Sequence, residues 1–250
     1  MAWRHEKEDF ARRILGLLYE KGMIRTCYRD KPDGWTLISG LYSPLYIQLR
    51  PIVSHPQLFA LICTAMVRMI KEEAPDVTKT VGIAMAGIPL VAGMSIVGNV
   101  PATFTRKLEG VKTVEALKLA ISSYGEHALL EGNLVKGDRL AIVDDLVTRF
   151  DSKQIALEQL KHEINRHGIE DVKCRTIAVV VDREQGGAEA ADELGVQLLR
   201  LIPFKSLGIE MLRAAMHPTE WDIIRRYLDN PASFQEDSVR QELADLCSRK

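Results

Sequence analysis

The feature that most constrains the fold is an alternation, between residues 80 and 202, of short apolar segments with segments of helical periodicity. Short apolar runs bounded by turns are typical of buried strands, and apolar residues three and four positions apart are typical of amphipathic helices. The expected strands cover residues 80–85, 102–105, 140–143, 175–181 and 196–202, and the expected helices between them cover 89–97, 153–167 and 187–194. Because strand–helix–strand units connect parallel strands, the sequence predicts an α/β fold with a mostly parallel central sheet and flanking helices.

The two ends of the chain differ from this repeat. Near the N-terminus, an amphipathic helix is expected first, followed by two short strands at residues 35–39 and 45–49. Near the C-terminus the composition changes at Thr219, and two further helices are expected. We therefore predict one domain over residues 1–216, which includes a small N-terminal hood segment, and a C-terminal helical appendage over residues 217–250.

Composition excludes several classes of function. The 250 residues include 33 Lys and Arg against 34 Asp and Glu, so no field of one sign favours nucleic acid or a membrane as a partner. The sequence offers no apolar run of about 18 residues for a membrane span, and residues 1–10 alternate charges instead of forming a signal peptide. The four cysteines are far apart in the sequence, so we expect no metal or redox pair among them. A cytoplasmic protein is predicted.

Polar residues follow the expected strands where each strand ends. Ligands of open parallel sheets bind beyond the carboxyl ends of the strands, so these residues are expected to converge on one rim. They are Ala86 and Gly87, Arg106 and Lys107, Asp144 and Asp145 with Thr148, Arg149 and Ser152, and Arg183. Carboxylate pairs, basic residues and glycine turns together suit an anionic, sugar-bearing ligand with a divalent metal. The G-x-G-x-x-G and G-x-x-x-x-G-K-[ST] motifs are missing, which argues against dinucleotide-binding and P-loop enzymes.

The Asp144-Asp145 pair is the main basis of this interpretation. Carboxylates at the end of a strand accept hydrogen bonds from a sugar diol and stabilise positive charge that develops on a ribose ring. The helix expected from residue 153 offers backbone N–H groups to a phosphate. Each candidate also has a purely structural alternative: a surface turn or cap for the acid pair, a tight turn for Gly87, a solvated pair for Arg106-Lys107, and an ion pair with Asp182 or Glu184 for Arg183.

The segment from residue 108 to 132 is longer than a routine connection. Loops of more than about 12–15 residues inside a compact domain are often active-site lids. The spacing of Val114, Leu117 and Ile121 predicts a short helix in its middle. A lid that excludes water suits chemistry at a reactive sugar carbon, where hydrolysis competes.

These motifs resemble those of a known family. Residues 143–148, Val-Asp-Asp-Leu-Val-Thr, resemble the start of the phosphoribosyl pyrophosphate motif of type I phosphoribosyltransferases, and the further matches are to the orotate phosphoribosyltransferases. Residues 39–50 resemble the base-site segment of that family, residues 86–90 its pyrophosphate loop, and residues 181–187 the segment whose arginine holds the carboxylate of orotate. The pairs Arg106-Lys107 and Tyr124-Gly125 resemble the two ends of its mobile catalytic loop. The resemblance covers about residues 10–212 and leaves the C-terminal appendage out.

The resemblance implies a reaction of pyrimidine nucleotide biosynthesis. A 5-phosphoribosyl group passes from phosphoribosyl pyrophosphate to orotate, giving orotidine 5′-phosphate and pyrophosphate. Mg²⁺ is expected to be held mainly by substrate oxygens and water, without a metal site built from protein side chains. The implied roles are ribose binding for Asp144 and Asp145, 5′-phosphate binding for Thr148 and Ser152, orotate binding for Arg183, pyrophosphate contact for Arg106 and Lys107, and further substrate contacts for Ala86, Gly87, Tyr46 and Tyr124. The family works as homodimers, so the basic pair is expected to serve the partner's site.

The phosphate loop departs from the family pattern. The family usually has Thr-Thr-Gly-Gly-Ser, whereas residues 148–152 read Thr-Arg-Phe-Asp-Ser. Glycines let the backbone wrap a phosphate, so Phe150 and Asp151 are expected to narrow the cradle, and Arg149 is expected to compensate with its side chain. Three hypotheses follow: an orotate phosphoribosyltransferase with a remodelled lid, a phosphoribosyltransferase for another base, and a degenerate paralogue that binds a nucleotide or phosphoribosyl ligand as a regulator.

Overall fold

The computed structural model describes residues 2–37, 39–124 and 128–248, except for the side chains of residues 123 and 124. Contacts divide the chain into two compact units. The first, called the sheet unit, comprises Met1–Lys7 and Ile52–Pro203. The second, called the terminal unit, comprises Glu8–Pro51 and Phe204–Lys250. Each unit therefore contains segments that are distant in the sequence.

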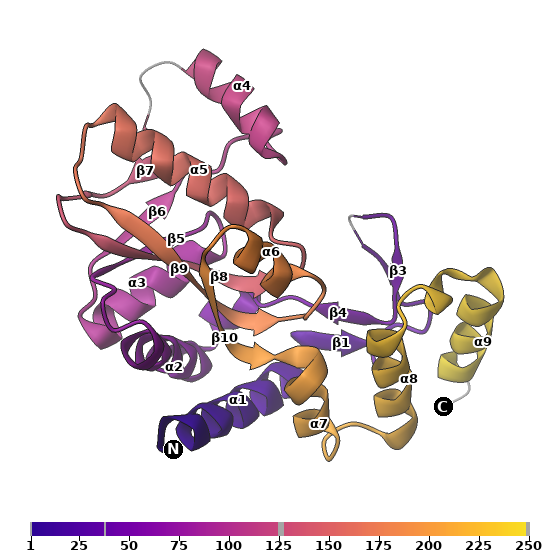
Figure 1. The fold of residues 1–250 in the computed structure, drawn as a ribbon. Helices are drawn as coiled ribbons and strands as arrows, with labels where there is room; N and C mark the ends of the chain where they lie inside the picture. Colours follow the sequence, from indigo (N-terminus) through magenta and orange to yellow (C-terminus); the bar gives the residue numbers. More distant parts are fainter. Residues whose placement is uncertain (1, 38, 125–127, 249–250) are drawn as a thin grey trace. The chain divides into compact units, whose positions relative to one another are not determined.

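The sheet unit is built on a six-stranded sheet in the order β10-β9-β8-β5-β6-β7 (Figure 1). Neighbouring strands are parallel except for the edge pair β6 and β7, which is antiparallel. The strands are β5 (Lys79–Gly82), β6 (Ala102–Thr105), β7 (Leu130–Glu131), β8 (Arg139–Val147), β9 (Lys173–Asp182) and β10 (Gln197–Pro203). Helices α2 (Pro56–Glu73) and α3 (Gly87–Gly98) lie on one face, and α5 (Asp151–Arg166) and α6 (Gly187–Glu193) lie on the other (Figure 1). The predicted α/β fold with a mostly parallel sheet and flanking helices is confirmed.

Strand β8 is longer than the sequence predicts. The strand expected at residues 140–143 continues to Val147, so the acid pair lies inside the strand and not after it. Its parallel partner β9 extends equally far, and the register places Asp144 opposite Val179 and Val147 opposite Asp182. Ladder hydrogen bonds to β9 therefore outweigh the low strand propensity of two aspartates.

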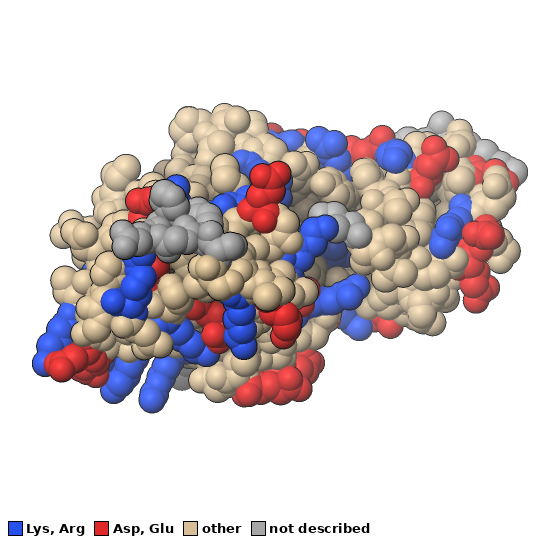
Figure 2. Space-filling model, turned by 90° about the horizontal axis from the view of Figure 1, so that it is seen from above, with Lys and Arg blue, Asp and Glu red and all other residues tan. Residues whose placement is uncertain are grey.

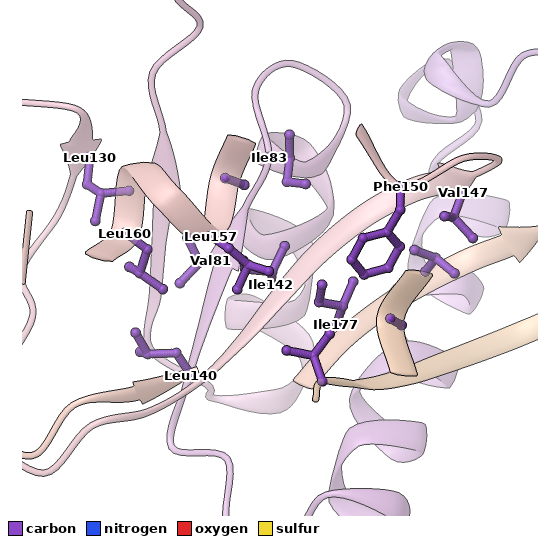
Figure 3. Packing of buried hydrophobic residues seen from close by; sticks show 14 residues of the cluster. Val81, Ile83, Leu130, Leu140, Ile142, Val147, Phe150, Leu157, Leu160 and Ile177 are labelled. Atoms are coloured by element: carbon purple, nitrogen blue, oxygen red, sulfur yellow. The ribbon is translucent and has the colours of Figure 1, made fainter. Parts of the chain in front are cut away.

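The hydrophobic core of the sheet unit lies between β8, β9 and helix α5 (Figure 3). Ile142 and Ile177 are completely buried in the two strands, and Leu157 and Leu160 face them from α5. Phe150, which directly precedes α5, belongs to the same cluster and is 2% exposed. Full burial of one such side chain stabilises a fold by about 1.5–3 kcal/mol. The start of α5 is therefore fixed by packing beneath it.

A second, smaller cluster holds the segment between β6 and β7. Helix α4 (Val114–Tyr124) lies in the middle of this segment, as predicted. Leu108, Leu117 and Leu129 are buried together and pack against an apolar side chain of α5. The carboxylate of Glu163, also on α5, accepts a hydrogen bond from the backbone N–H of Leu129 at 3.1 Å. The segment thus contains a seated helix, and its action as a lid stays a prediction.

The terminal unit contains two short antiparallel ladders. Strand β1 (Ile24–Thr26) pairs with β4 (Leu45–Ile47), and β2 (Trp35–Thr36) pairs with β3 (Tyr42–Ser43). The strands predicted at residues 35–39 and 45–49 are thus shorter than expected, and the sequence pattern does not predict β1 or β3. The helical elements of this unit are part of α1 (Ala2–Glu20), the 3-10 helix η1 (Arg50–Ser54) in part, the π-helical turn η2 (Phe204–Gly208), α7 (Ile209–Leu212), α8 (Pro218–Asp229), the 3-10 turn η3 (Ser233–Gln235) and α9 (Asp237–Ser248).

Residues 217–250 fall in the same compact unit as residues 8–51. The two compact units therefore have different boundaries from the predicted domain over residues 1–216 and appendage over residues 217–250. That predicted division stays a prediction. Within the described residues, no helix is both long enough and apolar enough to cross a membrane.

Two of the four cysteines touch inside the terminal unit. The Sγ atoms of Cys27 and Cys247 lie 3.4 Å apart, both residues are buried, and 220 positions separate them in the sequence. The expectation that no cysteines form a pair is therefore wrong. Spacing in the sequence gives no signal for a contact that the fold creates between the two ends of a chain.

Candidate active site

A buried lysine accompanies the acid pair of β8. Asp144 is 7% exposed, and its Oδ2 lies 2.8 Å from Nζ of Lys153, which is 3% exposed. The same ammonium group donates a hydrogen bond to the carbonyl of Leu146 at 2.5 Å. The other oxygen of Asp144, Oδ1, accepts the backbone N–H of Asp145 at 2.9 Å. Asp144 is thus held in place by an ion pair inside the protein.

Sequence reasoning missed Lys153, although the sequence contains a signal for it. Positions 153, 156, 157 and 160 of helix α5 are all buried, and they follow the three- and four-residue spacing of an apolar helix face. A lysine on such a face needs a buried anion as partner, because an unpaired charge is very costly away from water. The acid pair at the end of the preceding strand supplies that anion.

The second acid, Asp145, titrates near neutrality. The pKa of Asp145 is raised to about 7, mainly by burial and also by the neighbouring charge of Asp144, while the Lys153 ammonium opposes the rise. Its side chain is partly exposed, in contrast to Asp144. Of the two carboxylates, Asp145 is therefore the one that a ligand at this edge can reach.

The loop that follows β8 is shaped by Phe150. This residue has a left-handed backbone, with φ of 84°, which is rare outside glycine, and its ring is buried in the core below the loop (Figure 3). The expectation that Phe150 narrows the phosphate cradle is wrong, because the ring points into the core and anchors the loop. Arg149, Asp151 and Ser152 are exposed at the start of α5, and Thr148 is half-buried. The side chains predicted to hold a phosphate therefore face outward from a fixed loop.

The loop between β5 and α3 lies against the same end of β8. A Cβ atom on Gly87 would lie 2.3 Å from the carbonyl oxygen of Val143, and one on Gly82 would lie 2.6 Å from the carbonyl oxygen of Gly87. The backbone N–H of Ile83 also donates to Val143 at 3.0 Å. Only glycine allows this approach, so the loop with Ala86 and Gly87 is held next to the residue that precedes the acid pair.

A pocket of about 130 Å³ opens between the ends of β5 and β6 and the start of α5. It is lined in part by Ala84, Arg106, Lys107 and Ser152, so it joins three of the predicted site residues. Lys107 is exposed, whereas Arg106 is half-buried and lies 3.5 Å from a carboxylate oxygen of Glu131. Both basic residues therefore line the pocket, with Lys107 exposed to solvent and the charge of Arg106 partly neutralised by Glu131.

Arg183 follows β9, the neighbour of β8. It is 6% exposed, and its backbone N–H donates to the carbonyl of Val147 at 3.1 Å, so it adjoins the start of the phosphate loop. The fully buried carboxylate of Asp182 accepts a hydrogen bond from Arg200 at 3.1 Å and from the backbone N–H of Glu184 at 2.7 Å. Arg200 is thus a cation for Asp182 that sequence reasoning did not identify.

The sheet unit gathers most of the predicted site at the carboxyl edge of its strands. The residues it brings to this edge are Ala86, Gly87, Arg106, Lys107, Asp144, Asp145, Thr148, Arg149, Ser152 and Arg183. Tyr46 belongs to β4 of the terminal unit, where its ring stacks on that of Trp35 with centroids 5.7 Å apart. Tyr124 ends helix α4, and its side chain lies outside the described residues, as does Gly125.

Charge on the molecular surface is mixed. Figure 2 shows Lys and Arg side chains interspersed with Asp and Glu over one face, without an expanse of a single sign. Such a surface suits a local anion site better than a nucleic-acid track.

The sheet order and the acid pair at the end of β8 define the class: the chain has the fold of the type I phosphoribosyltransferases. Among solved structures it is similar to Leishmania donovani UMP synthase, with a TM-score of 0.69 and 23% identity, over 88% of this chain and 42% of that one. It is also similar to the orotate phosphoribosyltransferase of Aeropyrum pernix, with a TM-score of 0.59 and 20% identity, over 81% of this chain and 98% of that one. The chain thus spans less than half of the UMP synthase.

Among curated proteins, the relatives are orotate phosphoribosyltransferases. The enzyme of Methanocaldococcus jannaschii is 28% identical over 199 residues, which are 80% of this chain and 97% of that protein. The enzyme of Methanothermobacter thermautotrophicus is 28% identical over 201 residues, 80% of this chain and 94% of that protein. No protein-family model matches the chain. The resemblance to this family that the motifs indicate is confirmed.

Proposed function

We propose that this protein transfers the 5-phosphoribosyl group of phosphoribosyl pyrophosphate to orotate, with orotidine 5′-phosphate and pyrophosphate as products. One observation carries the proposal: the chain aligns with nearly whole orotate phosphoribosyltransferases, and its acid pair lies at the ligand-binding edge of the matching fold. The partly exposed Asp145 would accept hydrogen bonds from the ribose hydroxyls. Its negative charge would also stabilise the positive charge that develops on the ribose ring as pyrophosphate leaves.

The other candidates take roles around this carboxylate. Thr148, Arg149 and Ser152 would hold the 5′-phosphate at the start of α5, where backbone N–H groups and the helix dipole favour an anion. Asp151 in the first turn opposes this, and the Arg149 guanidinium would offset its charge. Lys107 and Arg106 at their pocket would contact the pyrophosphate, with Ala86 and Gly87 lining its path. Arg183 would hold the orotate carboxylate, since a guanidinium suits a planar carboxylate, and Tyr46 and Tyr124 would make further substrate contacts.

Mg²⁺ is the cofactor that this reaction implies. Within the described ranges of the chain, no group of three or more His, Cys, Asp and Glu side chains could hold a metal ion. Asp144 is already bound to Lys153, which leaves Asp145 as the one accessible carboxylate of the pair. This donor set fits an ion carried by the oxygens of the diphosphate and water, which suits the reluctance of Mg²⁺ to dehydrate. The bound ion would neutralise charge on the leaving pyrophosphate.

The decisive experiment follows orotate by its ultraviolet absorbance in the presence of the protein. We expect consumption that requires both phosphoribosyl pyrophosphate and Mg²⁺, and pyrophosphate released in equal amount. Asp145→Asn should remove turnover, while Asp151→Asn, a change in the same loop but on an exposed residue, should not. Lack of orotate consumption at high protein concentration and long times would refute the proposal.

A second candidate, a paralogue that binds a phosphoribosyl ligand without turnover, is favoured by two observations. The Lys153 ammonium occupies Asp144, and Asp151 stands at the phosphate position of the loop. Titration of the inactive protein with phosphoribosyl pyrophosphate in a calorimeter separates this candidate from the first. Heat of binding without product would support it, and Asp145→Asn should then weaken binding without affecting any partner protein.

A homodimer is proposed from the surface around α3. Ile96 is 85% exposed, Val97 is 47% exposed, and Met85 in the loop before the helix is 62% exposed. Exposed large apolar side chains before and at the end of one helix are a reason to expect that another subunit covers it. Sedimentation velocity should show a dimer for the natural protein and a monomer for Ile96→Lys. A cytoplasmic location is also proposed, in keeping with cysteines that are reduced thiols in the structure.

We also propose that Lys107 of one subunit contacts the pyrophosphate in the active site of its partner, and a mixing experiment tests this. Asp145→Asn and Lys107→Ala should each be inactive alone. If Lys107 serves the partner's site, half of the dimers in an equal mixture hold one intact site, and about a quarter of full activity returns. If Lys107 serves its own site, the mixture stays inactive.

A further inference from the structure

The C-terminal segment, defined here as residues 217–248, makes polar contacts with the base-site segment, defined as residues 39–50, and with the strand that pairs with it. The resemblance to orotate phosphoribosyltransferases stops before the C-terminal segment, at about residue 212. All of these contacts lie within the terminal unit. The segment therefore has a structural relation to a proposed substrate-binding element that the family resemblance does not account for.

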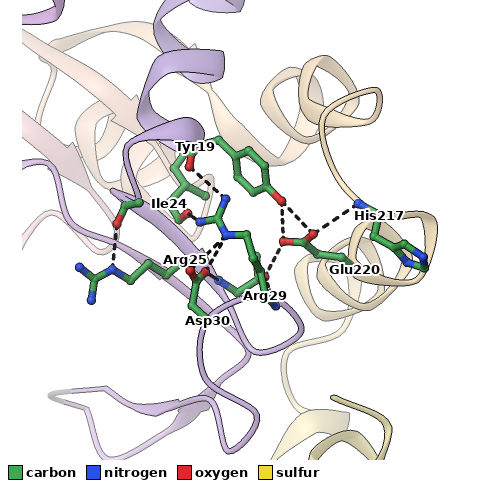
Figure 4. Close-up of polar contacts among 9 residues, drawn as sticks. Tyr19, Ile24, Arg25, Arg29, Asp30, His217 and Glu220 are labelled. Atoms are coloured by element: carbon green, nitrogen blue, oxygen red, sulfur yellow. Dashed lines mark hydrogen bonds and ion pairs between the residues drawn. The ribbon is translucent and has the colours of Figure 1, made fainter. Parts of the chain in front are cut away.

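The first contact is a buried carboxylate on α8 (Figure 4). Glu220 is 2% exposed and accepts hydrogen bonds from the Tyr19 hydroxyl at 2.9 and 2.8 Å and from the Thr26 hydroxyl at 2.5 Å. The backbone N–H of His217 also donates to it, at 3.4 Å. Thr26 belongs to β1, where it stands opposite Leu45 of β4. Glu220 therefore ties α8 to the ladder that carries Tyr46.

The second contact is made by the side-chain amide of Gln235, which hydrogen-bonds to the backbone of β3. The Oε1 atom of Gln235 accepts the backbone N–H of Tyr42 at 2.9 Å, and its Nε2 atom donates to the carbonyl of Tyr42 at 3.1 Å. One side chain thus satisfies both backbone groups of a single residue of β3, as a neighbouring strand would. Gln235 is itself fixed, because Nε2 donates to Pro231 at 3.0 Å and Arg240 donates to its carbonyl at 2.6 Å.

The base-site segment needs such support because its own ladders are very short. Strands β3 and β4 have two and three residues, and each pairs with a strand of the same length. Two-stranded ladders of this size are marginally stable in water without further packing. Contacts from outside the ladders must therefore fix their position.

We propose that the C-terminal segment is a clamp that positions the base-site segment for orotate, with Gln235 as its main positioning residue. The proposal rests on the function proposed above, because it assigns orotate to this segment. It predicts that loss of the Gln235 amide loosens the backbone around Tyr42 and weakens the binding of orotate. Phosphoribosyl pyrophosphate, which is proposed to bind at the sheet unit, should keep its affinity. A general loss of folding would affect both substrates alike.

Gln235→Ala in the full chain is the test, and Gln241→Ala is its matched control. Gln241 lies in the same segment, but it is exposed and its amide donates to Asp245 within α9, away from the base-site segment. For Gln235→Ala we expect the KM for orotate to rise about 5- to 10-fold, since two hydrogen bonds are lost. The KM for phosphoribosyl pyrophosphate and kcat should change by less than about two-fold, and Gln241→Ala should match the natural protein.

Hydrogen–deuterium exchange of the peptide containing Tyr42 gives a readout that does not need activity. Exchange there should be faster in Gln235→Ala than in the natural protein, with no change in peptides of β8 or β9. Equal rises in both KM values, or unchanged exchange at Tyr42, would overturn the clamp. A natural protein without turnover, with faster exchange at Tyr42 in the variant, would instead refute orotate transfer and leave the structural clamp standing.

Discussion

Both units of this protein bury carboxylates, and Asp144 in the sheet unit and Glu220 in the terminal unit are satisfied in different ways. In the sheet unit, Asp144 faces the buried ammonium of Lys153 at 2.8 Å. In the terminal unit, Glu220 accepts hydrogen bonds from two hydroxyl groups and a backbone N–H. A buried ion pair depends on the charge of both partners, whereas hydroxyl donors stay neutral over the ordinary pH range. The difference teaches that the charges of Asp144, Asp145 and Lys153 at the ligand-binding edge depend on one another. The hydrogen bonds of Glu220, by contrast, form a structural contact whose donors are neutral.

The sharpest way to break this comparison is Lys153→Met, which keeps the length of the side chain and removes its charge. Asp144 would then be a buried carboxylate without its cation, and removing one partner of a buried ion pair costs about 3–5 kcal/mol. We expect a loss of that size in the free energy of unfolding, measured by urea denaturation. Turnover should fall as well, because the pKa of Asp145 would rise further without the ammonium group.

The double variant Lys153→Met with Asp144→Asn shows whether this loss comes from the unpaired charge. Neutral asparagine does not need a cation, so most of the lost stability should return in the double variant. Strictly additive losses would mean that Lys153 acts through its packing and not through the pair, and the contrast with Glu220 would disappear.

The sequence predicts which residues lie at the candidate site better than it predicts their buried partners. Periodicity and strand-terminal motifs place Asp144, Asp145 and Arg183 at one edge, because parallel strands end on the same side. The position of the Phe150 ring could not be predicted, since a ring in this loop can point to a ligand or to the core, and only its packing in the folded core shows which. Lys153 could have been found from its place on the apolar face of α5.

A second prediction concerns the contact between the N-terminal and C-terminal segments of the terminal unit. The 3.4 Å contact between the Sγ atoms of Cys27 and Cys247 should allow a small-molecule disulfide to convert both thiols into one internal disulfide, with release of two small thiols. Burial raises the pKa of the Cys27 thiol, so the reaction should be slow at neutral pH and faster in base. The product should gain about 2–4 kcal/mol in stability.

Peptide mapping under non-reducing conditions is the measurement, with Cys27→Ser as the control that cannot form the bond. Cys63 and Cys174 should be recovered as single thiols. A mixed disulfide on Cys247 alone, or cross-linked dimers, would show that the two thiols do not approach closely enough to help join the ends of the terminal unit.

The contacts of the terminal unit mark the limit of sequence reasoning. Cys27 and Cys247 are 220 positions apart, and Gln235 and Tyr42 are 193 apart. No periodicity connects residues at such distances, and a glutamine in a polar helical stretch has the ordinary composition of a surface. The two helices of this segment are predictable, whereas what they hold depends on the tertiary fold.

A third prediction uses pH to sharpen the contrast between the units. The pKa of Asp145 is about 7 in the folded protein and about 4 in an unfolded chain, so the folded state binds more protons between these values. Stability contributed by this group should therefore fall as pH rises from about 4 to 7 and level off above. Urea denaturation of Asp145→Asn should lack this decline, whereas Asp151→Asn should retain it. Equal slopes in both variants would refute the raised pKa.

The smallest effect is expected at the other carboxylate. Glu220→Gln keeps one acceptor oxygen for the hydroxyl groups of Tyr19 and Thr26 but removes the negative charge. Hydrogen bonds to a charged group are stronger than those to a neutral one, so the loss in unfolding free energy should be about 1 kcal/mol. The decline in stability between about pH 4 and 7, which belongs to Asp145, should stay unchanged in this variant. If Glu220→Gln instead costs as much as Lys153→Met, or alters that pH profile, the carboxylate of the terminal unit is electrostatically coupled too, and the two units bury charge by the same means.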